Sequence, residues 1–286
     1  MASASIMNAS EETPLLTGTI PSTGERLPAI GLGTWRSFDV ASAAPGMGPL
    51  GEVLAAFSDM RGRIVDTSPM YGHAESAVGE LVASRNLRPR LFIATKVWTP
   101  GKAAGLRQVE ASMRKLHVER LDLLQVHNLL DVATQLPTLR NLKEAGRVRY
   151  IGVTHYTADA HDAVAEVLDS EPMDFVQINY SVYEREAEDR VLPLARDRGI
   201  AVIANRPFAS GGAWRRLRNR PLPAWAAELA CDSWAQLLLK FVVAHPAVTC
   251  AIPATAKPEH LRDNLRALHG ALPDAAMRER IAAAAR

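Results

Sequence analysis

The 286-residue sequence contains little cysteine. Its two cysteines, Cys231 and Cys250, are too few for a disulfide framework, and their spacing fits no metal site. We interpret both as buried, reduced thiols. An excess of either charge is also lacking, since 33 Lys and Arg residues against 31 Asp and Glu residues give a net charge of +2. The sequence therefore has no basic excess of the kind that indicates nucleic-acid binding.

Long hydrophobic runs are missing as well. The apolar residues 237–239 and 241–244 are separated by Lys240, and nothing approaches the ~18 apolar residues of a membrane span. The first Lys or Arg is Arg26, so the positively charged start of a secretory signal is absent. We therefore expect a cytoplasmic protein with no membrane partner.

The composition is that of a globular chain, with 48% apolar and 22% charged residues. Residues 1–16 are small and polar, and we predict a flexible N-terminal tail there. Residues 17–286 are predicted to form a single domain. At its start, residues 18–20 and 26–29 flank a Pro-Ser-Thr-Gly sequence, which predicts a β-hairpin.

After the hairpin, short apolar runs alternate with segments of helical period. The predicted strands are 30–33, 63–66, 91–96, 121–127, 150–153, 175–179, 201–205 and 248–252, and the predicted helices are 50–60, 75–84, 103–116, 133–144, 158–168, 186–198, 232–244 and 258–268. Asp232 is the expected N-cap of helix 232–244. Eight strand–helix repeats are the count of a (β/α)8 TIM barrel, an α/β fold. The alternative is a doubly wound sheet with a Gly-x-Gly-x-x-Gly loop, and that spacing fails here because residue 36 is Arg36.

Three consecutive predicted strands end in residues that can carry chemistry. Asp66 ends one strand and is followed by Tyr71, Lys96 ends the next strand, and His127 ends the one after that. The active sites of such barrels lie at the C-terminal ends of the strands, so we expect these side chains to lie close together. Singly, each could be a turn cap, a strand-end lysine, a packing aromatic or a core histidine.

Together these residues favour acid catalysis. A lysine buried near a barrel axis must be paired, and Asp66 is the natural partner of Lys96. The nearby ammonium is expected to lower the pKa of Tyr71 from about 10, which makes this phenol a plausible general acid. A neutral His127 could donate a hydrogen bond to a carbonyl oxygen.

At this point the sequence resembles the aldo-keto reductase family. The motifs that carry the resemblance have the family's order and spacing: Gly-Leu-Gly-Thr-Trp at 31–35, Asp-Thr at 66–67 with Tyr-Gly at 71–72, Thr-Lys-Val-Trp at 95–98, Val-His at 126–127, Gln-Ile-Asn-Tyr-Ser at 177–181, and Ile-Pro at 252–253 through Lys-Pro-Glu at 257–259 to Asn264. The resemblance implies NAD(P)H-dependent reduction of an aldehyde or ketone to an alcohol, with no metal. The resemblance further implies that Tyr71 is the general acid of this reaction, assisted by Lys96, Asp66 and His127.

The resemblance also implies contacts to the cofactor and the substrate. The cofactor-binding candidates are Gly33, Thr34, Trp35, Asp66, Thr154, His155, Gln177, Asn205, Arg206, Pro207, Phe208, Thr255, Lys257, His260 and Asn264. The substrate-pocket candidates are Trp35, Met70, Trp98 and Asn128. The aromatic that the family stacks on the nicotinamide is replaced at Asn205, so Arg206 or a group from elsewhere would have to cover the ring.

The residues expected at the adenosine end of the cofactor site are compatible with either NADP(H) or NAD(H). The family's NADP-selective members have Lys and Arg where this chain has Ala254 and His260. Lys257 and the arginine run at 215, 216, 218 and 220 are the remaining candidates for the 2′-phosphate. We expect NADP(H) to be preferred, with NAD(H) possible.

Two other functions fit parts of the pattern. A nicotinamide-binding regulatory barrel that acts through a partner would keep the same residues, and an exposed apolar patch on its helical surface would favour it. A phosphate-handling barrel such as an aldolase would leave Tyr71 and Trp98 unexplained. The sequence does not define the natural substrate, the physiological direction or the oligomeric state.

Overall fold

The protein is described by a computed structural model that covers residues 14–286. The predicted flexible tail therefore lies outside the described residues, except for its last three positions. There, the backbone N–H of Leu16 donates to the carbonyl of Leu268 at 2.8 Å, and Leu15 and Leu16 pack against the core. The chain is already held to the domain by hydrogen bonding at residue 16.

Eight strands of the described chain form one parallel sheet in sequence order. They are β3 (Leu32–Gly33), β4 (Ile64–Asp66), β5 (Phe92–Val97), β6 (Leu121–His127), β7 (Val148–Thr154), β8 (Phe175–Asn179), β9 (Ala201–Asn205) and β10 (Val248–Ala251). Parallel bridges pair Ile30 with Ala251 and Gly33 with Ala254, and so join the first strand to the last. The predicted (β/α)8 barrel is confirmed, and strands β6, β8 and β9 match their predicted bounds.

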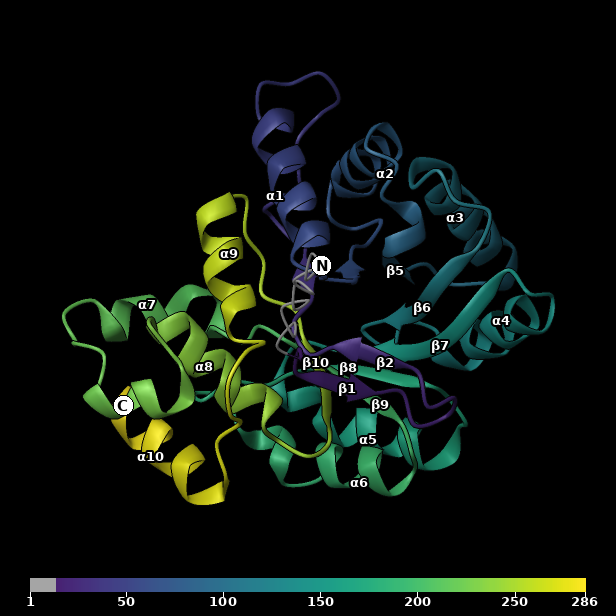
Figure 1. Cartoon of the computed structure of the whole chain (residues 1–286). Helices are drawn as coiled ribbons and strands as arrows, with labels where there is room; N and C mark the ends of the chain where they lie inside the picture. Colours follow the sequence, from purple (N-terminus) through teal and green to yellow (C-terminus); the bar gives the residue numbers. More distant parts are fainter. Residues whose placement is uncertain (1–13) are drawn as a thin grey trace, which may run out of the picture.

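Helices surround the sheet, as Figure 1 shows. The helices are α1 (Met47–Asp59), α2 (Ala74–Ser84), α3 (Lys102–Lys115), α4 (Val132–Glu144), α5 (His161–Ser170), α6 (Val191–Asp197), α7 (Gly212–Leu217), α8 (Trp234–Val243), α9 (Pro258–Arg266) and α10 (Ala275–Ala285). Short 3-10 helices are η1 (Arg88–Arg90), η2 (Ala158–Ala160), η3 (Glu186–Glu188), η4 (Ala209–Gly211) and η5 (Ala224–Leu229). Because helices cover the parallel strands, most strand residues are buried and hydrophobic.

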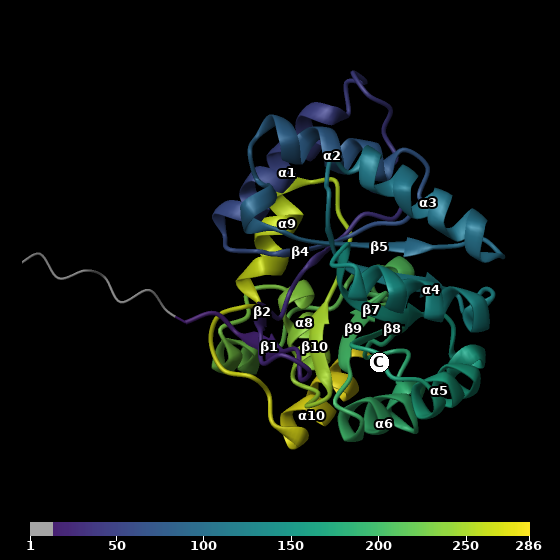
Figure 2. The ribbon, with the colours of Figure 1, turned by 90° about the vertical axis from the view of Figure 1, so that its right-hand side faces the viewer.

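The predicted hairpin is also confirmed. Strands β1 (Thr17–Thr19) and β2 (Arg26–Pro28) pair antiparallel, and Figure 2 shows them beside β10. Ile20 and Leu27 are buried with residues of the barrel interior such as Phe92 and Phe175. The hairpin therefore closes one end of the barrel and leaves the opposite end, where the strands terminate, available for a site.

The structure corrects two predictions about helices and adds two helices that were not predicted. Ser233, not Asp232, caps α8, because its hydroxyl accepts the backbone N–H of Gln236 at 3.2 Å from extended backbone. The helix predicted at 186–198 begins only at Val191, after the 3-10 turn η3. Sequence analysis also missed α7 and α10, although the carboxylate of Asp274 caps α10 by accepting the Met277 N–H at 2.8 Å.

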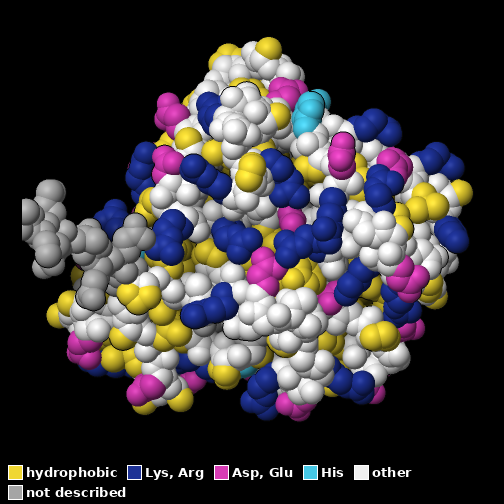
Figure 3. Space-filling view, turned by 45° about the vertical axis from the view of Figure 1, so that its right-hand side comes forward, with side chains coloured by type: hydrophobic (Ala, Val, Ile, Leu, Met, Phe, Trp, Pro, Cys, Tyr) yellow, Lys and Arg dark blue, Asp and Glu magenta, His cyan; other side chains and the backbone are white. Residues whose placement is uncertain are grey.

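The surface carries both signs of charge. On the face drawn in Figure 3, Lys and Arg side chains spread across the middle with Asp and Glu side chains between them. Among residues 14–286, no helix is long and apolar enough to cross a membrane.

Candidate active site

A cavity of about 560 Å³ opens where the barrel strands end. The residues that line it include Gly33, Asp66, His127 and Asn205, which end β3, β4, β6 and β9, and Gln177 in the middle of β8. Each of these residues was predicted to belong to the site. The parallel sheet brings them together because the carboxyl ends of all its strands face the same side.

The base of the site is a buried ion pair. The ammonium Nζ of Lys96 lies 2.7 and 2.9 Å from the two carboxylate oxygens of Asp66, and it donates to the carbonyl of Thr67 at 2.8 Å. Lys96 is fully buried, and Asp66 is 2% exposed. Burial disfavours the ammonium, but the attraction of Asp66 helps to outweigh it, and the pKa of Lys96 lies above its ordinary value. The lysine therefore stays charged at neutral pH.

Tyr71 lies beside Lys96 and, like Asp66, lines the cavity. The Lys96 ammonium is 5.0 Å from the centre of the Tyr71 ring. The expected lowering of the Tyr71 pKa is wrong for this structure: burial raises the pKa more than Lys96 lowers it. The phenol consequently holds its proton at neutral pH, as a proton donor must.

His127 is the second cavity residue with a defined protonation state. Its ring packs edge-on against Tyr71, with the ring centres 6.1 Å apart, and its Nδ1 lies 3.2 Å from the hydroxyl of Ser68. Burial, aided by the positive charge of Lys96, lowers the pKa of His127 to about 3. The imidazole is therefore neutral at physiological pH, as predicted from the sequence.

A chain of buried amides leads from Asp66 into the barrel. The Gln177 amide Nε2 lies 3.5 Å from a carboxylate oxygen of Asp66, and its Oε1 accepts from Nε2 of Gln125 at 2.9 Å. The side-chain carbonyl oxygen of Gln177 is therefore already occupied, by a Gln125 that is itself fully buried. The Gln177 amide is thereby held in one orientation at the floor of the cavity.

The structure places most of the other candidates in the cavity lining. The further predicted residues that line it are Thr34, Trp35, Met70, Asn128, Thr154, Arg206, Pro207 and Phe208. Sequence analysis considered Ala254 only as a position where NADP-selective relatives have a cationic residue. The lining residues that it did not assign to the site are Arg36, Tyr156, Ser210, Gly211, Trp214, Ile252 and Pro253. Tyr156 comes from the loop after β7, and its only sequence signal is an aromatic next to a strand end. Trp214 lies on α7, a helix of six residues that is too short to show a helical period.

Arg206 does not lie free over the cavity. Its guanidinium donates to the carbonyl of Tyr156 at 2.6 Å and to the hydroxyl of Ser210 at 2.7 Å, and it lies 3.6 Å from a carboxylate oxygen of Glu184. Aromatic faces are supplied instead by Tyr156, Trp214 and Phe208, which all line the cavity. Cover for a nicotinamide is thus available from groups other than Arg206.

Several predicted residues lie outside the cavity lining. Lys96 is behind Tyr71, and Trp98, whose backbone N–H donates to Gln108 at 2.6 Å, follows the end of β5. His155 stacks on Tyr156 with ring centres 5.5 Å apart. Of the adenosine-end candidates, Thr255 and Lys257 lie between the lining residue Ala254 and α9, and His260 and Asn264 lie within α9. Their roles stay predictions.

The cavity contains two buried amide oxygens that a nicotinamide dinucleotide can satisfy. Within residues 14–286, no donor reaches the buried amide oxygens of Asn128 and Asn205, and both residues line the cavity. Unsatisfied buried acceptors are costly, so they mark places where a ligand N–H or O–H can bind. Among the described residues, no cluster of His, Cys, Asp and Glu could hold a metal ion.

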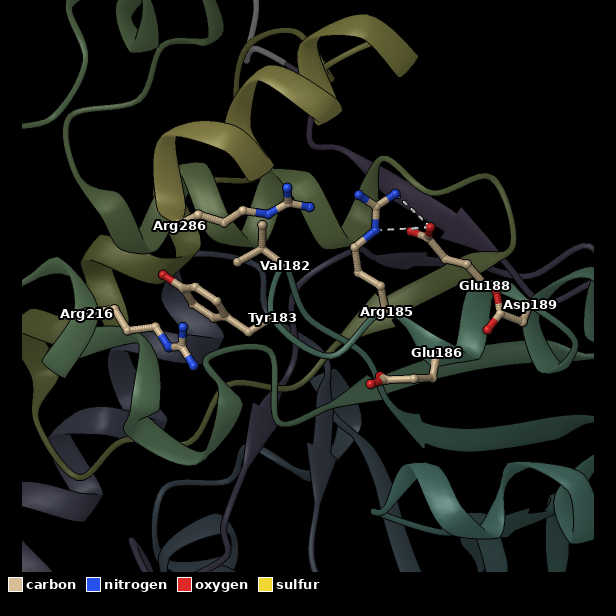
Figure 4. A pocket seen from close by; sticks show the side chains of 8 residues that line it. All are labelled: Val182, Tyr183, Arg185, Glu186, Glu188, Asp189, Arg216 and Arg286. Atoms are coloured by element: carbon tan, nitrogen blue, oxygen red, sulfur yellow. Dashed lines mark hydrogen bonds and ion pairs between the residues drawn. The ribbon is translucent and has the colours of Figure 1, made fainter.

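Two other hollows lie away from these residues. One of about 510 Å³, shown in Figure 4, is lined by Tyr183, Arg185, Glu188, Arg216 and neighbouring residues, and Arg185 pairs there with Glu188. The arginine run lines another hollow, of about 470 Å³. Neither contains a predicted catalytic residue, so the cavity at the strand ends is the candidate active site.

The barrel and the Asp66, Tyr71, Lys96 and His127 arrangement are those of a reductase of carbonyl groups. A sequence model of the aldo/keto reductase family matches residues 29–284, and the chain belongs to this family of oxidoreductases. It is 31% identical to methylglyoxal reductase YeaE of Escherichia coli (strain K12) over 261 residues, covering 87% of this chain and 88% of the relative. It is 29% identical to aldo-keto reductase YhdN of Bacillus subtilis (strain 168), but that match spans 60% of the relative's length.

Solved structures agree with this assignment. An aldo/keto reductase from Klebsiella pneumoniae in complex with NADP and acetate has a TM-score of 0.79 and 28% identity, covering 92% of this chain and 94% of that chain. A structure from the same organism in complex with NADPH has a TM-score of 0.78 and 28% identity, covering 93% of this chain and 94% of that chain.

Proposed function

We propose that this chain uses NADPH to reduce a small aldehyde or ketone to an alcohol, with Tyr71 as the proton donor. The observation that carries the proposal is the Tyr71 phenol held between a buried Lys96–Asp66 pair and a neutral His127 at the cavity. The NADP and NADPH complexes of the two Klebsiella pneumoniae structures support the choice of cofactor. The bound dinucleotide would supply a hydride to the carbonyl carbon.

The chain's own residues have separate tasks in this proposal. Negative charge develops on the carbonyl oxygen, and Tyr71 gives it a proton. Lys96 favours the phenolate that remains because its ammonium lies 5.0 Å from the ring centre, and Asp66 keeps that ammonium charged. His127 donates a hydrogen bond to the same oxygen and, being neutral, leaves the transfer of the proton to Tyr71.

The cofactor would be held along the cavity and towards α9. Gln177, Thr154 and Asn205 offer amide and hydroxyl groups for a carboxamide, and Asn205 has a free buried oxygen. Lys257 and the arginine run stay alternative partners for a 2′-phosphate. The first substrate to test is methylglyoxal, because a methylglyoxal reductase is 31% identical to this chain.

A regulatory barrel without its own catalysis is less well supported. Four of the six large exposed hydrophobic side chains among the described residues, Trp35, Met70, Tyr156 and Trp214, line the cavity. Such a distribution favours binding of small molecules at the barrel mouth over docking of a protein partner on the helices. A cytoplasmic location, which the sequence predicted, fits a reaction that uses NADPH.

Binding and turnover together test the proposal. Fluorescence titration should give tighter binding of NADPH than of NADH, and NADPH oxidation should depend on methylglyoxal or on another member of a panel of aldehydes and ketones. Binding of NADPH without oxidation by any carbonyl on the panel would contradict the enzymatic function. Tighter binding of NADH would contradict only the cofactor preference.

A further inference from the structure

We propose that Ser68 is a positioning residue that fixes the tautomer of His127, so that the ring presents its Nε2–H to the cavity. This inference rests on the proposed function for its kinetic consequence, but not for its structural one. Ser68 follows β4 by two residues, whereas His127 ends β6, so the contact joins two parts of the barrel rim. The Ser68 hydroxyl lies 3.2 Å from Nδ1 of His127, and Ser68 is fully buried.

The direction of this hydrogen bond follows from counting protons. The backbone N–H of Met70 donates to the Ser68 hydroxyl oxygen at 3.2 Å, so that oxygen already accepts one hydrogen bond. Its own hydrogen needs an acceptor, and among the described residues His127 Nδ1 is the one within reach. Were Nδ1 to donate instead, the serine hydrogen would be buried without a partner, which is costly.

The tautomer then follows from the charge of the ring. A neutral imidazole carries one N–H, and a nitrogen that accepts a hydrogen bond is not the one that carries it. With Nδ1 accepting from Ser68, the proton is on Nε2. His127 lines the cavity, and no hydrogen bond of residues 14–286 uses its Nε2, so this N–H is free for a carbonyl oxygen.

Ser68 also shapes the turn that carries Tyr71. The backbone N–H of Tyr71 donates to the Ser68 carbonyl at 3.0 Å, and the Ser68 hydroxyl holds Met70. Loss of the hydroxyl could therefore act on catalysis through the turn as well as through His127. An experiment must separate these routes.

Nuclear magnetic resonance of ¹⁵N-histidine-labelled protein reads the tautomer without any turnover. The His127 signal is identified by its loss in His127→Gln. Wild type should show a neutral ring protonated on Nε2, and Ser68→Ala should show a gain of the Nδ1-protonated form. The matched control is Ser112→Ala, which removes another buried serine hydroxyl, one that has no partner, and it should leave the signal unchanged. A wild-type ring protonated on Nδ1, or an unchanged ring in Ser68→Ala, would overturn the inference.

A double-mutant cycle tests the kinetic consequence. Ser68→Ala should lower kcat/KM for the carbonyl about tenfold, the scale of one hydrogen bond, and leave the Kd for NADPH unchanged. In a His127→Phe background the same change should cost almost nothing, because the ring that Ser68 orients is gone. An equal loss in both backgrounds would assign the effect to the turn and refute positioning of His127. A wild type that reduces no carbonyl would refute the proposed function, while the tautomer measurement would still decide the Ser68 contact.

Discussion

Removing the carboxylate of Asp66 should destabilise the fold and not only abolish activity. The Lys96 ammonium is fully buried and has three oxygen partners within 3 Å, two of which belong to Asp66. Asp66→Ala would leave this charge with the Thr67 carbonyl alone. Breaking a buried pair from one side costs about 3–5 kcal/mol. For a domain of this size, the melting temperature should fall by about 10 °C.

Thermal unfolding followed by circular dichroism measures this loss. Asp169→Asn is the control, because it breaks an exposed pair with Arg198, and such pairs contribute about 0–1 kcal/mol. The double variant Asp66→Ala with Lys96→Met should recover most of the lost stability, because it removes the orphaned charge. An Asp66→Ala protein that melts with wild type would refute the reasoning, and so would a double variant less stable than the single one.

Three further results are expected. NMR should show that His127 stays neutral down to about pH 4. Because its pKa in the folded state lies below that in the unfolded state, its contribution to stability should be lost as the pH falls from about 6.5 towards 3. Titration of His127 near pH 6.5 would contradict this. Lys257→Ala should weaken NADPH about tenfold and spare NADH, whereas equal losses would indicate a structural role. Lys240→Met should destabilise the fold by about 2 kcal/mol, because the buried ammonium of Lys240 donates to the carbonyls of Leu229, His269 and Ala271. An unchanged melting temperature would argue against this role of Lys240.

The sequence predicted what depends on strand order and strand ends. Asp66, Lys96 and His127 were placed at one rim because each ends a short apolar run, and parallel strands bring such ends together. The pairing of Asp66 with Lys96 followed from the cost of burying a lone ammonium. These arguments use local pattern and general energetics, which a sequence contains.

The features that sequence analysis missed depend on how deeply a side chain is buried and on segments that have no periodic sequence pattern. The pKa of Tyr71 was expected to fall because a nearby ammonium lowers it, but the extent of burial, which raises it, is fixed by the folded rim. Trp214 enters the cavity from α7, a helix of six residues that is too short for a periodic pattern to locate its side chains. Helix α10 was missed because its alanine-rich sequence carries almost no amphipathic pattern.

The contact of Ser68 with His127 was equally invisible in the sequence. The two residues are 59 positions apart, and serine in a Thr-Ser-Pro segment reads as an ordinary turn residue. Only the folded rim shows that its hydroxyl, already accepting from Met70, faces a histidine nitrogen. The same holds for Gln125, which orients the Gln177 amide from inside the barrel.

The central claim is that Tyr71 delivers the proton during carbonyl reduction. The most direct measurement is stopped-flow oxidation of bound NADPH by methylglyoxal, or by the most active carbonyl of the panel, in wild type and Tyr71→Phe. The variant should bind NADPH as wild type does, and its rate of oxidation should fall by about 10²–10⁴-fold, the scale of general acid catalysis. A Tyr71→Phe enzyme that retains more than half of the wild-type rate would contradict the claim.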